Sequence, residues 1–360
     1  MRKPRISRAI SMGEPSLRIE DGRFLTGRGR YVDDLAMPNC AHVVFVRSPH
    51  AHARINALNT AEAKAMPGVL AVLTGADWAA DSGGRLACMY SVTSDDGAPM
   101  KEATRPVMVT DVARHVGDPL AIVVAETLAQ SLDAAEAIEP QVDVLEAVTD
   151  LERASHQHGP LVHPSFATNI AFDWSVGDPV ATQRALDGAT QVASIDVLNN
   201  RVHGFTLEPR AVVGEYHPVE ESYTLWSTTQ MPHVIRECLA EQSLRVPAHR
   251  IRVVAPDIGG GFGLKGCHYA EEAAVLWAAR RVGRPVRWTA TRTESFIADV
   301  HARDHATHAK IAFDDGGRIL GIWIDTLANL GAYVSLFGPG CPGIFGMGSI
   351  CGIYDLPAAY

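Results

Sequence analysis

Residues 257–266 form the stretch whose composition most directly indicates chemistry. Four of the five positions 259–263 are glycine, and the fifth is Phe262. Glycine is costly in backbone entropy, and it is kept where the backbone turns through positive φ or where a ligand approaches closely. We expect a strand over residues 250–255 and a helix over residues 269–281, whose first N–H groups are free to point at an anion. The pattern predicts a loop that contacts a cofactor.

The same stretch contains a G-x-G-x-x-G pattern at residues 261–266. A Rossmann-type dinucleotide site explains this pattern, with Glu294 near the position of a ribose-binding acid. That motif does not require the extra glycines at 259 and 260, and too little sequence follows for a doubly wound domain. A dinucleotide-binding oxidoreductase and a purely structural tight turn both stay open as alternatives.

Two short polar segments follow expected strands. Gln230 ends a Ser-Thr-Thr-Gln run at residues 227–230, where its amide can either donate into a cleft or cap the next helix. Residues 207–210, Leu-Glu-Pro-Arg, predict a surface ion pair of small energetic value.

Three histidines, His301, His305 and His308, have the spacing of a zinc site if residues 301–308 are helical. The neighbouring Thr307, Ile311 and Phe313 favour a strand instead, on which the three do not share a face. We therefore expect structural histidines there, and the same holds for His50, His52, His156, His158 and His163. The sequence contains no P-loop, nucleophile elbow or paired-carboxylate signature.

The composition is that of an ordinary soluble globular protein. The chain has 360 residues, 47% of them hydrophobic, and a net charge of −9, which argues against a nucleic-acid partner. No signal sequence follows the basic N-terminus. The uncharged run over residues 326–354 is interrupted by many glycines and prolines, so we expect buried, irregular backbone and no membrane helix. The six scattered cysteines predict reduced thiols in a cytoplasmic protein and hold no familiar iron–sulfur motif.

The periodicity predicts an α+β protein with a leader at 1–19, a first block at 20–150, a linker at 151–165 and a second block at 166–360. We expect first-block strands at 29–32, 41–47, 69–73, 106–110 and 119–125, with helices at 60–65 and 127–138. In the second block we expect strands at 191–198, 211–216, 223–227, 285–290, 306–313 and 319–327, and a helix at 233–244. Residues 315–317, Asp-Gly-Gly, predict a hairpin turn.

Several ordered motifs together resemble a known family, the molybdenum-cofactor-binding large subunits of xanthine dehydrogenase, aldehyde oxidase and aerobic carbon monoxide dehydrogenase. The resemblance extends from about residue 17 to residue 360. Its markers lie at residues 47–55, 66–69, 116–119, 207–210, 227–230 and 259–263.

This resemblance implies a small α/β hammerhead domain followed by the first part of a mixed α+β molybdopterin-binding domain. It places Gln230 near the apical oxo ligand of the molybdenum. It implies that Phe262 and Gly263 present their backbone to the metal centre or its dithiolene, and that Gly260 and Gly261 belong to the same cofactor-binding loop. The implied cofactor is molybdenum–molybdopterin, with the cytosine dinucleotide form expected. No residue of this chain is expected as a metal ligand or catalytic base.

In such enzymes a small molecule, for instance an aldehyde or an N-heterocycle, is oxidised with water-derived oxygen. The electrons pass to an iron–sulfur subunit and an FAD-binding subunit, which are the expected partners. Gly266 departs from the glutamate of purine hydroxylases and argues against a xanthine-like substrate. Residues 138–142 also depart from the family pattern, so we expect that edge of the first block to differ.

The length is the largest departure, because family large subunits are roughly twice as long. The general-base glutamate and an arginine-glycine cofactor loop lie outside this chain. We therefore expect a further chain to supply the C-terminal half of the molybdopterin domain, and the isolated chain to be inactive. The alternative from another class is a non-catalytic remnant that binds no cofactor.

Overall fold

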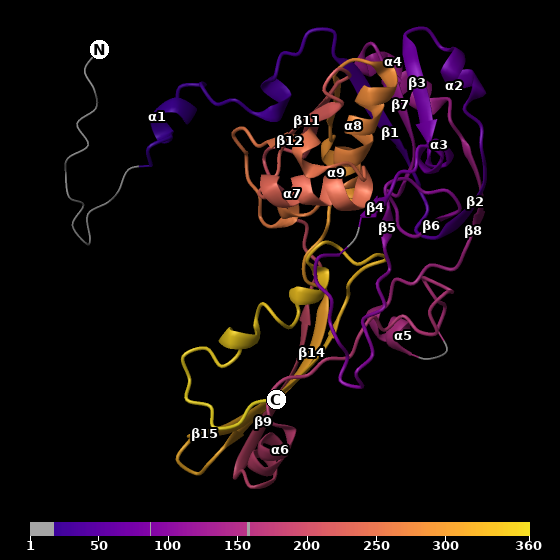
Figure 1. Ribbon diagram of the computed structural model, residues 1–360. Helices are drawn as coiled ribbons and strands as arrows, with labels where there is room; N and C mark the ends of the chain where they lie inside the picture. The colour runs from indigo at the N-terminus through magenta and orange to yellow at the C-terminus, as the bar shows by residue number, and fades with distance from the viewer. Residues whose placement is uncertain (1–17, 87, 157–158) are drawn as a thin grey trace, which may run out of the picture.

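The largest element of the fold is a seven-stranded mixed sheet (Figure 1). A computed structural model describes residues 18–86, 88–156 and 159–360, so most of the expected leader and His158 lie outside the described residues. The strand order is β12-β11-β10-β13-β1-β7-β3. The pairs β11/β12 and β1/β13 are parallel, and the other neighbours are antiparallel. The strands are β1 (Ala41–Arg47), β3 (Val69–Thr74), β7 (Pro119–Ala125), β10 (Ala211–His217), β11 (Ser222–Ser227), β12 (Ile251–Val254) and β13 (Val286–Thr289).

Both faces of this sheet are covered by helices. The helix α8 (Ala270–Val282) packs on β10 and β13, and its Val275, Leu276 and Trp277 join the main core. The helices α2 (Ala61–Ala65) and α4 (Leu128–Glu136) lie with a second core around Val46 and Val123. Strand β7 is buried at all seven positions because alternate side chains enter the two cores, which is why it reads as a continuous apolar run.

A separate three-stranded sheet extends away from this body, together with α6 (Pro179–Asp187) (Figure 1). Its antiparallel order is β15-β14-β9, with β9 at Gln191–Asn199, β14 at His305–Phe313 and β15 at Ile319–Ala328. The turn between β14 and β15 closes at Gly317, whose φ of 76° requires a residue without a side chain. This confirms the hairpin expected at residues 315–317.

Short strands complete the first block. One sheet has the order β6-β2-β8, and β4 pairs with β5. The strands are β2 (Ala53–Leu58), β4 (Arg85–Leu86), β5 (Arg105–Pro106), β6 (Val112–Ala113) and β8 (Pro140–Val144). Strand β8 starts at the proline and still pairs with β2 across a register shift near Ile55. Proline is tolerated there because it stands at the first position of a strand.

The sequence located most long elements and misjudged several short ones. The expected strands at 41–47 and 119–125 have the observed bounds, and α2 and α4 are present. The strand expected at 29–32 is wrong, because Val32–Asp34 is a 3₁₀ turn (η1), and the strand at 106–110 shrinks to β5. The helix at 233–244 is divided into α7 (Pro232–Cys238) and a π-helical turn η2 (Leu239–Ser243).

Further corrections concern apolar or irregular stretches. The strand β2 and the helices α3 (Gly75–Ala80) and α6 were not expected, and α5 (Leu151–Ser155) lies inside the expected linker. The uncharged run at 326–354 is irregular as expected, but only residues within 333–340 are buried: Leu336 is 3% exposed and Ile353 97%. No helix in the described ranges is long and apolar enough to cross a bilayer. The domain boundaries at 150 and 166 stay a prediction.

All six cysteines are free thiols. Burial raises the pKa of Cys238 and of Cys267 to about 12, so these two thiols are unreactive at neutral pH. Cys341, in contrast, is exposed.

Candidate functional site

The glycine loop, residues 257–266, connects β12 to the 3₁₀ turn η4 (Leu264–Gly266). Its backbone passes three times through the left-handed region, with φ of 104° at Gly260, 49° at Phe262 and 80° at Gly263. A phenylalanine in this region is rare and costs of order 1 kcal/mol, and such strain gathers at functional sites. The Phe262 side chain is 75% exposed, so it contributes little burial to offset that cost.

Gln230 lies directly against the loop. A Cβ placed on Gly261 would lie 2.5 Å from Cδ of Gln230, so only glycine leaves room for that amide. The carbonyl of Lys265 accepts hydrogen bonds from the Gln230 backbone N–H at 2.9 Å and from the Thr229 hydroxyl at 3.2 Å. The structure therefore brings together the residues expected from the sequence, and their role as cofactor contacts stays a prediction.

Four successive backbone donors of this loop are unused. The N–H groups of residues 260–263 donate to no acceptor within the described part of the chain, and the exposed Gln230 amide also makes no hydrogen bond there. Successive free N–H groups around left-handed residues form a concave site for an anion or an oxygen ligand. The loop can thus bind an electron-rich group through its backbone.

Glu208 and Lys265 hold the two ends of the loop. The Glu208 Oε2 atom accepts from the Gly259 N–H at 2.7 Å and from Lys265 Nζ at 2.8 Å. The Lys265 side chain is fully buried, and its burial lowers its pKa although the Glu208 carboxylate opposes that effect. The other oxygen, Oε1, is buried and has no partner among the described residues.

The surface ion pair expected within residues 207–210 is wrong. Glu208 pairs with Lys265, whereas Arg210 turns the other way and donates to Glu271 at 2.8 Å and to Asp299 at 2.5 Å. Arg210 is 4% exposed, so these are buried interactions. Glu208 and Arg210 therefore support different parts of the site. Glu208 binds the loop through Lys265, and Arg210 binds Glu271 and Asp299.

A buried charge network lies behind the loop. Glu271, at the start of α8, accepts from Arg210 and also from Arg47 of β1 at 2.6 Å. Burial disfavours the Glu271 carboxylate, but Arg210 and Arg47 outweigh burial and hold its pKa well below its usual range. Arg47 also binds Glu294, so that residue is occupied in an ion pair. Removal of one member would leave an uncompensated buried charge.

The start of α8 differs from the expectation that its N–H groups face an anion. Residues 267–269 intervene between the glycine loop and the helix, and the first turn of α8 is buried. The Glu272 carboxylate accepts from the Tyr269 N–H at 3.1 Å and contacts His268 Nδ1 at 2.7 Å. The carboxylates of Glu271 and Glu272 therefore compensate the positive end of the helix dipole. The donors available to a ligand are the backbone N–H groups of the loop itself.

A tether fixes the outer side of the loop. Asp257 accepts two hydrogen bonds from the Arg23 guanidinium, one of them 2.7 Å long, and a third from the Arg30 N–H. The bond from Arg23 and the one from Arg30 lower the Asp257 pKa to about 2. The helix α1 (Asp21–Phe24) is thereby connected to the site.

The three histidines at residues 301, 305 and 308 have separate surroundings. His305 and His308 lie on opposite faces of β14, and His308 contacts Asp196 at 2.7 Å. His301 contacts the Phe296 carbonyl at 2.9 Å. The described chain contains no group of three or more His, Cys, Asp or Glu residues that could hold a metal.

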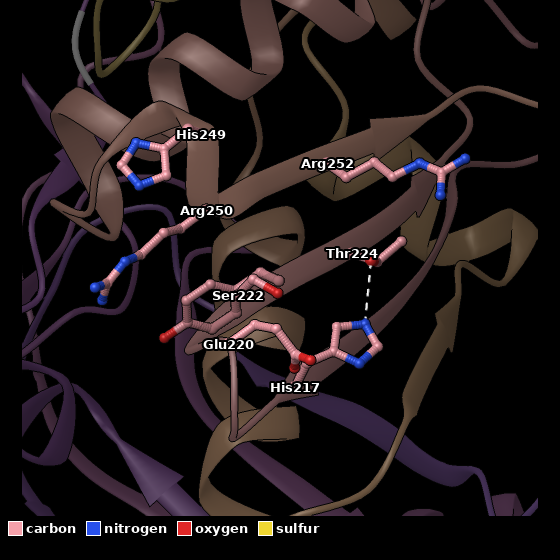
Figure 2. A pocket seen from close by; sticks show the side chains of 8 residues that line it. His217, Glu220, Ser222, Thr224, His249, Arg250 and Arg252 are labelled. Carbon is pink, nitrogen blue, oxygen red and sulfur yellow. Dashed lines mark hydrogen bonds between the residues drawn. The ribbon is translucent and has the colours of Figure 1, made fainter.

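A depression of about 280 Å³ lies at the edge of the large sheet, away from the glycine loop (Figure 2). It is lined by His217, Glu220, Ser222, Tyr223, Thr224, His249, Arg250 and Arg252. Figure 2 shows the Arg250 and Arg252 side chains extending to opposite sides, so these cations do not converge on one ligand. Arg250 is also neutralised by Glu221 at 2.6 Å.

Sequence reasoning singled out residues 207–210 and 257–266 but missed the role of five residues in supporting the loop: Glu208, Lys265, Arg47, Arg210 and Glu271. One signal was available. The segment at 270–279 is apolar except for two adjacent glutamates, and acids on a helix buried all round require cationic partners.

Comparison with known proteins gives two family matches. Residues 162–360 match the molybdopterin cofactor-binding domain, and residues 26–145 match the a/b hammerhead domain of aldehyde oxidase and xanthine dehydrogenase. The nicotine 6-hydroxylase large subunit of Paenarthrobacter nicotinovorans is 34% identical over 99% of this chain and 43% of its own length. The carbon monoxide dehydrogenase large chain of Hydrogenophaga pseudoflava is 33% identical over 95% of this chain and 42% of its own.

Among solved structures, quinoline 2-oxidoreductase from Pseudomonas putida 86 superposes with a TM-score of 0.88 at 34% identity. That match covers 98% of this chain and 44% of the other. The chain therefore spans less than half the length of the curated relatives it matches. The hammerhead domain followed by a molybdopterin-binding domain confirms the α+β fold expected from the sequence.

Proposed function

Because this chain belongs to the family of molybdopterin-binding large subunits of molybdenum hydroxylases, we propose that its glycine loop forms one wall of a molybdenum–molybdopterin site. The observation that carries the proposal is the set of N–H groups at residues 260–263, which have no acceptor in the described part of the chain, beside the Gln230 amide. These donors suit an electron-rich, oxygen-bearing group. A Cβ at Gly261 would overlap the Gln230 side chain and so displace one of the donors.

In this proposal the residues of the chain bind and orient. The backbone of Phe262 and Gly263 and the side chain of Gln230 donate toward the bound group, while Glu208 and Lys265 hold the loop in its strained conformation. The cofactor, when bound, supplies two-electron redox chemistry and transfer of water-derived oxygen. The chain's own contribution is a set of fixed donors, which need no reorganisation during the reaction.

The substrate class in this proposal is a small molecule such as an aldehyde or an N-heterocycle rather than a purine. Gly266, which stands where purine hydroxylases have a glutamate, is buried, and a Cβ there would lie 3.6 Å from Sδ of Met231. No carboxylate is available at this position. The names of the similar proteins, nicotine 6-hydroxylase and quinoline 2-oxidoreductase, support a nitrogen heterocycle.

The proposed assembly contains an iron–sulfur subunit, an FAD-binding subunit and a polypeptide that supplies the rest of the molybdopterin-binding region. The coverage of only 43% of the nicotine 6-hydroxylase large subunit supports the last of these. We infer the cytosine dinucleotide form of the cofactor and a cytoplasmic location from the family resemblance alone.

The test is to purify the chain alone and after co-expression with the assembly partners. We expect the assembly to contain equimolar molybdenum and pterin, the latter measured by the fluorescence of its oxidised form. We also expect the assembly to oxidise a heterocycle or an aldehyde with an artificial dye as electron acceptor. The chain alone should show no turnover. An assembly without molybdenum or pterin would make the chain a non-catalytic remnant, a bound nicotinamide would favour the dinucleotide reading, and full activity of the chain alone would refute the need for a further polypeptide.

A further inference from the structure

The sheet β9-β14-β15 has one face that is apolar from edge to edge. The register places Ala193, Ile311 and Ile322 side by side, and Ile195, Ala309 and Ile324 in the next row. Side chains alternate between the two faces of a sheet, so these rows share one face. The third row consists of Val197, Thr307 and Thr326, and no charged residue lies in any of the three rows.

This apolar face is not the one that α6 covers. A Cβ on Gly321 would lie 3.0 Å from Cβ of Ala185 in α6, and Gly321 points to the opposite face from Ile322. Ile195 is 59% exposed and Val197 44% exposed. An antiparallel sheet commonly exposes one of its faces to water, but that face is then polar. Contiguous exposed apolar surface marks an interaction site.

Strand β9 is also an open edge. It pairs with β14 on one side, and all nine of its residues are exposed within the described chain. At the other edge of the sheet, residues 358–360 pair with β15 through Ile322 and Ile324. A long, flat, apolar edge strand with free backbone groups is a template for another chain, and proteins cover such edges.

Two exposed apolar residues lie on the segment that connects the sheet to Glu208. After β9 the chain passes through Phe205, which is 49% exposed, and Leu207, which is 86% exposed, before it reaches Glu208. A Cβ on Gly204 would lie 3.3 Å from Cβ of Phe262, so this segment contacts the loop. An occupant that extends from the β9 edge along this segment would reach the proposed cofactor site.

We propose that the apolar face of β9-β14-β15 and the β9 edge dock the polypeptide that completes the molybdopterin-binding region. The occupant follows from length: more than half of each similar large subunit lies beyond the part that this chain matches. It also follows from position, since the chain runs from β9 past the exposed Phe205 and Leu207 to a loop whose donors have no acceptor among the described residues. This inference rests on the proposed function, because the occupant is the chain that the cofactor site needs.

The experiment uses the full chain and, as probe, the remainder of the Paenarthrobacter nicotinovorans nicotine 6-hydroxylase large subunit beyond its matched part. The two halves of that relative, expressed as separate chains, are the cognate pair. We expect a 1:1 complex by size-exclusion chromatography with light scattering, and reduced hydrogen exchange in β9. The double substitution Ile195→Lys and Val197→Lys should weaken the complex about a hundredfold, because it places two charges in an apolar contact.

The matched control is Val219→Lys, which changes an 89% exposed valine after β10, on the other sheet, and should leave the complex unchanged. Both variants should keep the unfolding temperature of the free chain, since the altered side chains are exposed. A complex that the double variant forms equally well overturns the proposal. The absence of a complex, either with this chain or between the cognate halves, also overturns the proposal. If this chain alone forms a dimer and the double variant is monomeric, the occupant of the sheet face is a second copy of the chain and the proposal is wrong.

Metal analysis separates this inference from the proposed function. A complex that depends on Ile195 and Val197 but holds no molybdenum or pterin supports the docking face and refutes the cofactor site. A complex that holds molybdenum and pterin regardless of these substitutions supports the cofactor site and refutes the docking face.

Discussion

The Oε2 atom of Glu208 accepts hydrogen bonds from two groups that lie at either end of the glycine loop. Its ion pair with Lys265 is worth little as a source of net stability, since taking both charges out of water cancels much of their attraction. Its value lies in geometry, because the two bonds fix the separation of residues 259 and 265. The loop can then keep left-handed backbone at Phe262.

Replacement of this carboxylate by an amide should be strongly destabilising. Glu208→Gln leaves the Lys265 ammonium buried without a counter-charge, which costs about 3 kcal/mol in the free energy of unfolding. Denaturant titration measures this loss. The double variant Glu208→Gln with Lys265→Met should regain most of it, and failure to regain it would show that the pair does not act as a unit.

The control for this prediction is the pair of Glu146 and Arg153, whose side chains are both 59% exposed. Glu146→Gln should change the free energy of unfolding by less than about 1 kcal/mol, as for surface ion pairs in general. Equal losses at Glu146 and Glu208 would contradict the structural role assigned to Glu208.

Gly261 allows a test of the Gln230 contact without disturbing the fold. In Gly261→Ala the new methyl group overlaps the end of the Gln230 side chain, which is flexible and exposed and can move away. We expect a change of only about 0.5 kcal/mol in stability but a clear loss of molybdenum in the purified assembly.

Gly266→Ala is the matched control in the same loop, since a Cβ there makes only an ordinary contact with Met231. Unchanged molybdenum content in Gly261→Ala, or an equal loss in both variants, would contradict the prediction that the Gln230 amide contacts the cofactor.

At the scale of elements, the loop depends on parts of the chain that are distant in sequence. Helix α1 approaches it through Arg23 and Asp257, β1 supports it through Arg47, and α8 provides Glu271. The contacts of Arg23 with Asp257 and of Arg47 with Glu271 join residues more than two hundred positions apart, which no local pattern reveals.

The Asp257 tether should depend on pH. Its carboxylate has a pKa of about 2 in the folded protein against 3.8 ordinarily, so the ionised form is favoured by folding. The contribution is fully present above pH 4 and is lost as the pH falls from about 4 to about 2. The protection factors of the amides of residues 21–30, which compare their exchange with that of an unstructured chain at the same pH, should fall over this interval.

In Asp257→Asn the same residues should have low protection factors at every pH, because the ion pair with Arg23 is absent. If the protection factors of residues 21–30 in the unaltered protein stay constant between pH 5 and pH 2, the tether contributes nothing to the order of this segment.

The sequence was informative where the pattern is local. The glycines and Phe262 located the loop, and the apolar run at 119–125 located β7, because burial on both faces leaves a continuous apolar strand. The resemblance to a family added Gln230. The partners of Glu208 and Arg210 could not be found this way, because these two residues, only two positions apart, bind Lys265 and Glu271, which lie in different elements.

The prediction of short elements from the sequence failed for a related reason. Strand β2 has only one fully buried residue, Ala53, so its sequence lacks a clear alternation. The expected strand at 29–32 has the turn glycines of a strand boundary, but its backbone N–H at Arg30 binds Asp257 instead of a neighbouring strand. Tertiary contacts decided these segments, and local propensity did not.

At the scale of the whole molecule, the two sequence blocks share one sheet. Strand β1 of the first block pairs with β13 of the second, with Ala41 opposite Val286. The main core includes Phe45 from the first block and Trp288 from the second, with ring centroids 5.8 Å apart. The expected boundary near residue 150 is therefore a division of the sequence across which the packing is continuous.

Because the packing is continuous, we predict that the two fragments of a chain cleaved between the blocks stay together. We expect a protease site inserted between residues 156 and 159 to give two fragments that stay associated and unfold in one cooperative transition. Separation would expose the β1 edge and the core around Phe45 and Trp288, at about 25 cal/mol for each Å² of apolar surface. Calorimetry and size-exclusion chromatography of the cleaved protein measure this. Two transitions, or fragments that elute apart, would show that the hammerhead part folds by itself and that the shared sheet forms only by docking.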